Sequence, residues 1–258
     1  MPVRLPFTIE RLKRIYRRLR RPFRKTREER FFGGDAWDHG EELSRRRYES
    51  YDAYLEHQRH KLSHRLPKLQ ENRDNAIGKI VRHFRACPQL PPRSRVLCLG
   101  ARIGSEVEAL IRLGHFAVGI DLEPGPENRY VMHGDFHDLV FADDSVDVVY
   151  TNCLDHLFDL DRVASEIARV LRPGGVALID IADGHEEGWT AGGYEATWWS
   201  RAETFADRLA QASGLERVGF RSIADYGYPR KNQVALIKRD AGQVPTSATD
   251  SRKPTQQP

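Results

Sequence analysis

The sequence predicts an α/β protein: a doubly wound, mostly parallel seven-stranded sheet with one antiparallel strand and a helical N-terminal extension. Three observations support this fold. From Arg93 on, short apolar runs alternate with helical patterns. These runs are almost continuously hydrophobic, which is typical of parallel strands covered by helices on both faces. The last two runs are joined only by "ADYGYPRK", without helical periodicity, so we expect them to pair as an antiparallel hairpin.

The elements of this sheet can be placed in order along the chain. The seven strands are expected at residues 95–99, 116–121, 129–135, 146–152, 175–181, 215–223 and 232–239. Helical patterns connect several of them, at about residues 105–113, 159–171 and 200–213.

The N-terminal third has a different character. Its first segment, "TIERLKRIYRRLRRPFRK", spaces apolar residues by three and four, which predicts a basic amphipathic helix ended or kinked near Pro22. Two further helices are expected at residues 41–66 and about 68–86, before the prolines of "CPQLPPR" interrupt the pattern. The predicted organisation is a basic arm (1–30), a helical segment on the substrate or membrane side (31–92), the main domain (93–239) and a disordered tail (240–258).

Charge and cysteine content bear on partners and location. The net charge is only +4, but residues 1–30 contain 12 Lys and Arg against 3 Asp and Glu. A helix with such a polar face suits an anionic membrane surface or another acidic partner. The three cysteines lack metal-ligand spacing and a disulfide pattern, and no apolar run suits a membrane span or secretory signal. We therefore expect a cytoplasmic protein. Peripheral attachment at the inner face of the membrane is the functional interpretation of its arm, and a solvated arm, or a helix that packs its apolar stripe on its own domain, is the competing one.

The turn after the first strand of the sheet predicts a ligand site. Gly100 and Gly104 lie between that strand and a helix, where open α/β sheets bind nucleotides. Asp121 ends the second strand, the usual position of a carboxylate that binds ribose hydroxyls. A nicotinamide cofactor and S-adenosylmethionine are both compatible with these residues. A dinucleotide fingerprint would have a third glycine near Ser105, and this sequence has none.

Two later segments distinguish these cofactors. "GDFHDLVFADDSVDVVYTN" and "ARVLRPGGVALIDI" resemble the later motifs of the class I S-adenosylmethionine-dependent methyltransferases, and the resemblance covers roughly residues 80–239. Within this class, the sequence resembles the type 11 methyltransferases. The resemblance implies the Rossmann-like methyltransferase fold and S-adenosylmethionine as cofactor.

The resemblance also implies roles for individual residues. Gly100, Ala101, Arg102 and Gly104 would form the loop under the methionine moiety. Asp121 would bind the ribose hydroxyls with Leu122 against the adenine, Asp135 and Phe136 would hold the adenine edge, and Asn152 would lie beside the methionine end.

The chain departs from the family pattern at two positions. Cys98 stands where an acidic residue is usual, and Arg102 where a glycine is usual. Glu106, one turn into the next helix, is the nearest carboxylate to meet the methionine ammonium in its place. Arg102 would in turn meet the methionine carboxylate.

The sequence gives a less specific signal for the methyl acceptor than for the cofactor. A hydroxyl acceptor needs a base, and the region after the fourth strand offers His156, with Asp155 beside it. A packed or helix-capping histidine is the competing interpretation. The loop "DGHEEGWTAGGYEATWWS" (183–200) suits a flexible lid whose aromatic faces stack on sugar rings or a lipid edge. Glu186 and Glu187 of this loop, with Asp155, have carboxylates that can bind a divalent cation. Acidic residues at a protein surface usually bind no metal, so none is assigned.

These observations favour methyl transfer to a small molecule, glycan or lipid-linked sugar, with a hydroxyl as acceptor. "TNCLDHLFDLDRV" and "GARIGSEVEAL" are similar to methyltransferases associated with bacterial surface polysaccharides, which implies polysaccharide biosynthesis. A nucleic acid acceptor is disfavoured, because "TNCLDH" lacks the Asp/Asn-Pro-Pro-aromatic stretch of amino-group methylators. The alternatives are an RNA-directed methyltransferase, a non-catalytic methyltransferase-like binding protein and an NAD-dependent oxidoreductase.

Overall fold

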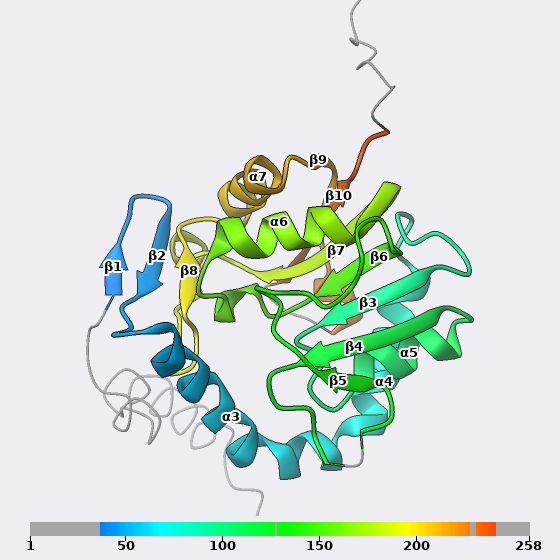
Figure 1. The fold of residues 1–258 in the computed structure, drawn as a ribbon, viewed down its shortest axis with the longest axis horizontal. Helices are drawn as coiled ribbons and strands as arrows, with labels where there is room; N and C mark the ends of the chain where they lie inside the picture. The colour runs from blue at the N-terminus through cyan, green and yellow to red at the C-terminus, as the bar shows by residue number, and fades with distance from the viewer. Residues whose placement is uncertain (1–36, 127, 228–230, 241–258) are drawn as a thin grey trace, which may run out of the picture.

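The protein is described by a computed structural model that covers residues 37–126, 128–227 and 231–240 (Figure 1). The predicted arm (1–30) and nearly all of the predicted tail (240–258) lie outside the described residues. Among the described residues, none of the helices combines the length and the apolar character needed to cross a membrane.

A seven-stranded sheet forms the centre of the fold, in the order β5-β4-β3-β6-β7-β10-β9. Its strands are β3 (Arg95–Leu99), β4 (Phe116–Asp121), β5 (Val131–His133), β6 (Val146–Thr151), β7 (Leu171–Ala182), β9 (Glu216–Ser222) and β10 (Lys231–Ile237). Only β10 runs against its neighbours β7 and β9, and the remaining pairs are parallel. This confirms the predicted doubly wound sheet with one antiparallel strand.

Helices cover both faces of this sheet, as Figure 1 shows. The helices α4 (Arg73–Arg85) and α5 (Ser105–Arg112) lie on one face, and α6 (Leu160–Val170) and α7 (Ala202–Ser213) on the other. The strands contribute to both cores: Leu97 and Leu99 pack with α6, while Val96 and Cys98 pack with α4 and α5. Alternate side chains of one strand thus enter opposite cores, which explains why the strands are apolar throughout.

The chain order places a switch point between β3 and β6. From β3 the chain continues outward through β4 and β5 and then returns to β6 on the other side of β3. Ligands of open α/β sheets bind beyond the carboxyl ends of the strands at such a point. The turn at Gly100 leaves β3 at this place.

The helix predicted at residues 41–66 is wrong in its first part. Residues there form β1 (Trp37–His39) and β2 (Leu43–Arg46), and helix α3 (Tyr51–Glu71) begins only after Ser50. The Ser50 hydroxyl accepts a hydrogen bond from the Ala53 amide (3.2 Å), which caps the helix. Strand β2 pairs with β8 (Thr197–Trp199), so a partner distant in sequence determines its conformation.

The second predicted helix, at about residues 68–86, is confirmed as α4 but begins later. Helix α3 continues through Pro67 to Glu71, and the break between the two helices lies at Asn72. The proline is therefore accommodated inside α3 and does not end it.

The loop at residues 183–200 also differs from expectation. It contains a short 3-10 helix, η3 (His185–Glu187), and strand β8, which completes a three-stranded sheet with β1 and β2. Trp199 is 2% exposed and stacks on Phe205 with ring centroids 4.0 Å apart, and Tyr194 is 1% exposed. These two rings belong to the core, so the prediction that they face an acceptor is wrong.

Candidate functional site

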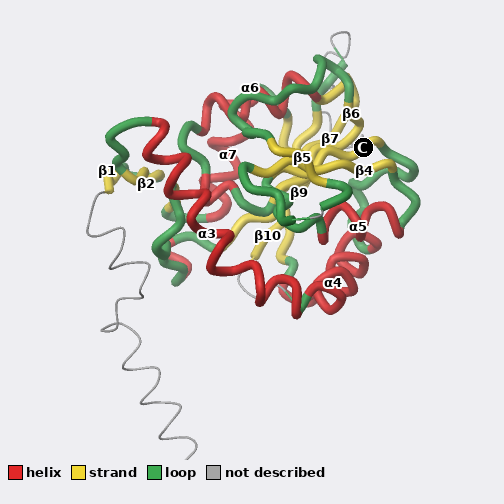
Figure 2. The backbone as a smooth tube through the Cα atoms, turned by 60° about the horizontal axis from the view of Figure 1, so that its bottom comes forward, coloured by secondary structure: helices red, strands yellow, loops and turns green. Residues whose placement is uncertain are grey.

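A cavity lies beyond the carboxyl ends of β3, β4 and β6, beneath helix α3. Figure 2 shows how α3 runs past this end of the sheet before the chain enters α4. The cavity is lined by Tyr54, Gln58, Lys61, Arg65, Gly100, Arg102, Asp121, Leu122, Glu123, Phe136, Cys153 and His156. Six of the residues predicted from the sequence are therefore brought to one place: Gly100, Arg102, Asp121, Leu122, Phe136 and His156.

The glycine turn brings the backbone close to the floor of this cavity. Gly100 has φ +66° and Gly104 has φ +77°, backbone conformations that residues with a Cβ rarely adopt. A Cβ on Gly100 would lie 2.2 Å from Cys153 Sγ. Arg102 also has a positive φ, 46°, although it is not a glycine. The turn after β3 therefore needs a glycine at position 100 for close packing as well as for its backbone conformation.

Asp121 holds two loops together at the cavity. Its Oδ2 accepts a hydrogen bond from the Arg102 amide and its Oδ1 from the Glu123 amide, both at 2.9 Å. Burial raises the pKa of this carboxyl, and the two amides act in the opposite direction. Each oxygen retains a lone pair, so the carboxylate can still accept from a ligand hydroxyl.

Glu106 and Asn152 also meet, although neither lines the cavity. The Asn152 amide donates to Glu106 Oε1 at 3.1 Å. Burial raises the pKa of Glu106, and burial together with the Glu106 carboxylate raises the pKa of the Cys98 thiol. A carboxylate thus lies near the position where Cys98 replaces the usual acid. Its assignment to the methionine ammonium stays a prediction.

Asp135 is engaged by the protein itself. Its Oδ1 accepts from the His137 amide at 2.8 Å and contacts the His137 ring, while its Oδ2 accepts from the Tyr51 hydroxyl of α3. The next residue, Phe136, is 8% exposed and lines the cavity. Asp135 therefore joins α3 to the loop after β5. To hold the adenine edge as predicted, the same two carboxylate oxygens would also have to accept from the ligand.

His156 lies on a 3-10 helix, η2 (Leu154–His156), directly after β6. Its Nδ1 lies 2.9 Å from the Tyr194 carbonyl, which can only accept, so Nδ1 carries the proton and Nε2 does not. Nε2 contacts Lys61 Nζ and lies 3.7 Å from Asp155 Oδ2. Burial, together with the neighbouring Lys61, lowers the pKa of His156 well below its usual value. The imidazole is therefore neutral near pH 7.

Helix α3 contributes functional residues that the sequence reasoning missed. Lys61 is 8% exposed, and burial, assisted by Arg102, lowers its pKa to about 7. On the same helix face, the Tyr54 hydroxyl donates to the His156 carbonyl and the Gln58 amide to the Tyr194 carbonyl, both at 3.0 Å. The available signal was the spacing of Tyr54, Gln58, Lys61 and Arg65 by three and four residues.

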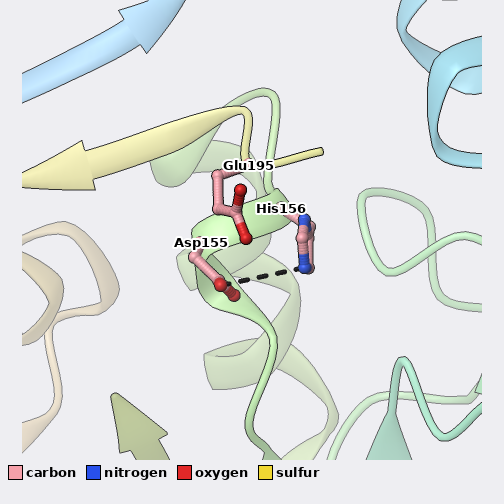
Figure 3. A group of neighbouring side chains, drawn as sticks. All are labelled: Asp155, His156 and Glu195. Atoms are coloured by element: carbon pink, nitrogen blue, oxygen red, sulfur yellow. Dashed lines mark ion pairs between the residues drawn. The ribbon is translucent and has the colours of Figure 1, made fainter. Parts of the chain in front are cut away.

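Three potential metal ligands also gather beside Lys61. Asp155, His156 and Glu195 place one ligand atom each within 4.8 Å of one another, and Figure 3 shows their side chains converging. However, both ring nitrogens of His156 are engaged, by Tyr194 and by Lys61. We therefore interpret the two carboxylates as counter-charges near Lys61 and assign no metal to the group.

Comparison with known proteins supports a family assignment. Residues 97–179 match the type 11 methyltransferase profile, described as "Methyltransferase domain". A protein of Mycobacterium sp. (strain KMS), named an uncharacterized methyltransferase, is 33% identical over 134 residues, or 45% of this chain and 53% of that protein. The malonyl-[acyl-carrier protein] O-methyltransferase of Methylococcus capsulatus is 34% identical over 99 residues, or 33% of this chain and 36% of that protein. The chain thus spans about half the length of the mycobacterial relative.

Solved structures show the same fold. The 1,6-didemethyltoxoflavin-N1-methyltransferase of Burkholderia thailandensis, solved with S-adenosylhomocysteine, has a TM-score of 0.57 at 17% identity and covers 80% of this chain and 100% of that one. A TehB-like S-adenosylmethionine-dependent methyltransferase of Corynebacterium glutamicum has a TM-score of 0.51 at 20% identity, covering 69% and 99%. Together with the strand order, these matches support a class I S-adenosylmethionine-dependent methyltransferase domain in this chain.

Proposed function

We propose that this protein transfers a methyl group from S-adenosylmethionine to a hydroxyl of a small molecule, glycan or lipid-linked sugar. The observation that carries the proposal is the buried Lys61–His156 contact in the cavity beneath α3. A hydroxyl acceptor must lose a proton during methyl transfer, and this pair offers a nitrogen to take it.

The residues present fit the cofactor. Gly100 and Arg102 of the turn after β3 line the cavity at the place expected for the methionine moiety. Asp121 retains acceptor capacity for ribose hydroxyls, and Leu122 and Phe136 offer apolar contacts for an adenine. These three residues, with the turn at 100–104, would hold the cofactor.

The chemistry divides between cofactor and chain. When bound, S-adenosylmethionine supplies a methyl group on a positively charged sulfur, an electrophile for in-line displacement. The chain aligns the acceptor, excludes water beneath α3 and accepts the acceptor proton. Asp155, 3.7 Å from His156 Nε2, provides negative charge beside the nitrogen pair that stabilises an added proton.

We further propose that the basic arm brings the protein to the cytoplasmic face of the membrane, where lipid-linked sugars would be its acceptors in surface polysaccharide synthesis. The support is the 12 Lys and Arg against 3 Asp and Glu in residues 1–30. Anionic lipids attract such a segment by about 1 kcal/mol for each basic residue near the surface.

A carboxylate acceptor is the second candidate. Lys61, Arg65 and Arg102 place three basic side chains around the cavity, which suits an anionic group. The Methylococcus relative is named for methylation of a malonyl group. A carboxylate needs no base, so the two candidates require different chemistry from Lys61.

Methyl transfer from radiolabelled S-adenosylmethionine tests the proposal. The acceptor panel contains methyl glycosides, undecaprenyl-linked oligosaccharides, malonyl-acyl carrier protein and total RNA. The proposal expects label in a sugar-containing acceptor, released as a methyl ether that is stable to mild alkali. Alkali-labile label in the malonyl acceptor would identify a carboxyl methyltransferase, and label in RNA would identify an RNA-directed one. If the protein binds S-adenosylmethionine but labels no acceptor, a non-catalytic binding protein is supported.

A further inference from the structure

Lys61 is buried in the cavity wall although lysine is rarely buried. It projects from α3 into the space beyond β3, β4 and β6, with 8% of its surface exposed. A buried ammonium without compensation is costly, so such a residue usually has a task or a dedicated partner.

We propose that Lys61 is the catalytic base that takes the proton from the acceptor hydroxyl, and that His156 is a positioning residue which orients the Lys61 amine. This inference rests on the proposed hydroxyl methylation. It assigns the proton transfer to a residue of α3 and not to His156, the base candidate of the sequence analysis.

The hydrogen-bond directions support this assignment. Because His156 Nδ1 donates to the Tyr194 carbonyl, the lone pair of Nε2 faces Lys61 Nζ. Nε2 is thus an acceptor that Lys61 occupies, and an acceptor hydroxyl would have to displace the lysine to reach it. A neutral Lys61 can donate one N–H to Nε2 and direct its own lone pair into the cavity.

Burial and the charges around Lys61 together determine how much of its amine is neutral. Burial and Arg102 lower its pKa. From its own helix, Arg65 lines the same cavity, and His57 is neutral near pH 7 because burial lowers its pKa to about 4. Asp155 and Glu195, and less strongly the Cys153 thiol, oppose this shift, and Asp121 lies on the same cavity wall. The balance places the pKa at about 7, so a large share of Lys61 is neutral at physiological pH.

The neutral Lys61 amine takes the hydroxyl proton and becomes an ammonium, while the acceptor oxygen forms the new bond to the methyl carbon. The electron pair of the broken C–S bond stays on sulfur, whose positive charge is thereby lost. The new ammonium faces Asp155 and Glu195, and it returns its proton to water after product release.

The first test measures the protonation of Lys61 directly, without turnover. The full chain is labelled with ¹³C,¹⁵N-lysine, and the lysine signals are followed by NMR from about pH 5 to about pH 11.5. The Lys61 signal is assigned by its absence in Lys61→Met. Titration near pH 7 is expected, and titration near the ordinary lysine value of about 10.4 would overturn the proposal.

The second test uses variants of both residues with the acceptor found in the panel. Lys61→Met should lower kcat by roughly 100-fold or more, the usual contribution of a general base. Lys61→Arg should be equally impaired, because an arginine keeps the charge but does not release its proton. Lys68→Met, an exposed lysine of the same helix, is the matched control and should retain wild-type kcat. Rescue by Lys61→Arg would show a cation acting on an anionic acceptor and would overturn the base.

Two substitutions of His156 distinguish a positioning role from a role as the base. A glutamine can donate to the Tyr194 carbonyl and accept from Lys61, whereas a phenylalanine can do neither. His156→Gln should therefore retain most of kcat and the lysine titration near pH 7, and His156→Phe should lose kcat and shift that titration. Equal loss in both variants, with the lysine titration unchanged, would make His156 the base.

Failure of this inference is separable from failure of the proposed function. A wild-type protein that methylates a sugar hydroxyl, together with an active Lys61→Met, would overturn only the role of Lys61. A wild-type protein that methylates malonyl-acyl carrier protein and no hydroxyl would overturn the proposed function, and the base with it. Affinity for S-adenosylmethionine, measured by calorimetry for every variant, shows that each has folded.

Discussion

Gly100 and Cys153 pack so closely that a Cβ on the glycine would lie 2.2 Å from the cysteine Sγ. This contact joins the turn after β3 to the segment after β6, across the switch point of the sheet. The packing of the cavity wall therefore depends on a glycine at position 100 and on the size of the residue at position 153.

The contact predicts a partly compensating pair of substitutions. Gly100→Ala should abolish measurable S-adenosylmethionine binding and destabilise the fold by about 2 kcal/mol or more, because the clash adds to the cost of φ +66°. The double variant Gly100→Ala/Cys153→Ala removes the sulfur and should recover part of the stability. Urea unfolding and calorimetry check both quantities, and strictly additive effects would contradict the contact.

Asp121→Ala should lower S-adenosylmethionine affinity by about 100-fold or more while the domain stays folded. The substitution removes the proposed ribose acceptor and also the hydrogen bonds from the Arg102 and Glu123 amides, so a loss of about 1–3 kcal/mol of stability should accompany it. Calorimetric titration and thermal unfolding are the measurements. Near-normal affinity would place the cofactor elsewhere.

Tyr51→Phe should loosen α3, because the Tyr51 hydroxyl donates to the Asp135 carboxylate. A hydrogen bond to a charged group contributes about 1.5–3 kcal/mol, and hydrogen exchange of the α3 amides should accelerate accordingly. Tyr130→Phe, at a 37% exposed tyrosine, is the control and should leave α3 protected. Burial opposes the shift, but the hydrogen bonds from His137 and Tyr51 outweigh it and lower the pKa of Asp135. The stabilisation is therefore present above the unfolded pKa of about 3.9 and is lost as pH falls through the folded value.

Lys61 predicts an unusual dependence of stability on pH. Its pKa falls from 10.5 to about 7 on folding, so the unfolded chain binds more protons between these values. Stability should therefore rise with pH across this window, by up to about 1.4 kcal/mol for each pH unit, and the destabilisation is complete below the folded pKa. The difference in unfolding free energy between wild type and Lys61→Met, measured by urea, should shrink as pH rises from 7. A pH-independent difference would mean that Lys61 keeps its charge in the folded state.

Deletion of residues 1–30 should release the protein from anionic liposomes and leave its affinity for S-adenosylmethionine unchanged. The expectation follows from the basic charge of this segment, and binding of the full chain should weaken with added salt. Liposome flotation with and without the arm measures it. If the shortened protein floats with the vesicles as before, the arm is not the anchor.

The sheet was readable from the sequence because local pattern and tertiary role agree there. Strands β3 and β4 were predicted to the residue, since each is an apolar run that contributes to both cores and ends at a change in composition. The antiparallel end of the sheet followed from the short link between its last two strands.

The sequence-based predictions fail where residues distant in the sequence determine the local structure. Leu43 to Arg46 fit a helical spacing, yet pairing with β8 makes them a strand, and the Ser50 cap sets the start of α3. Lys61 was missed because a lysine on a helix is normally solvated. Only the position of α3 over the strand ends buries it.

Calorimetric titration of the purified protein with S-adenosylmethionine, S-adenosylhomocysteine and NAD tests the cofactor assignment most directly. We predict micromolar binding of the first two and no binding of NAD. Absence of binding by S-adenosylmethionine and S-adenosylhomocysteine, or binding of NAD in their place, would contradict this assignment.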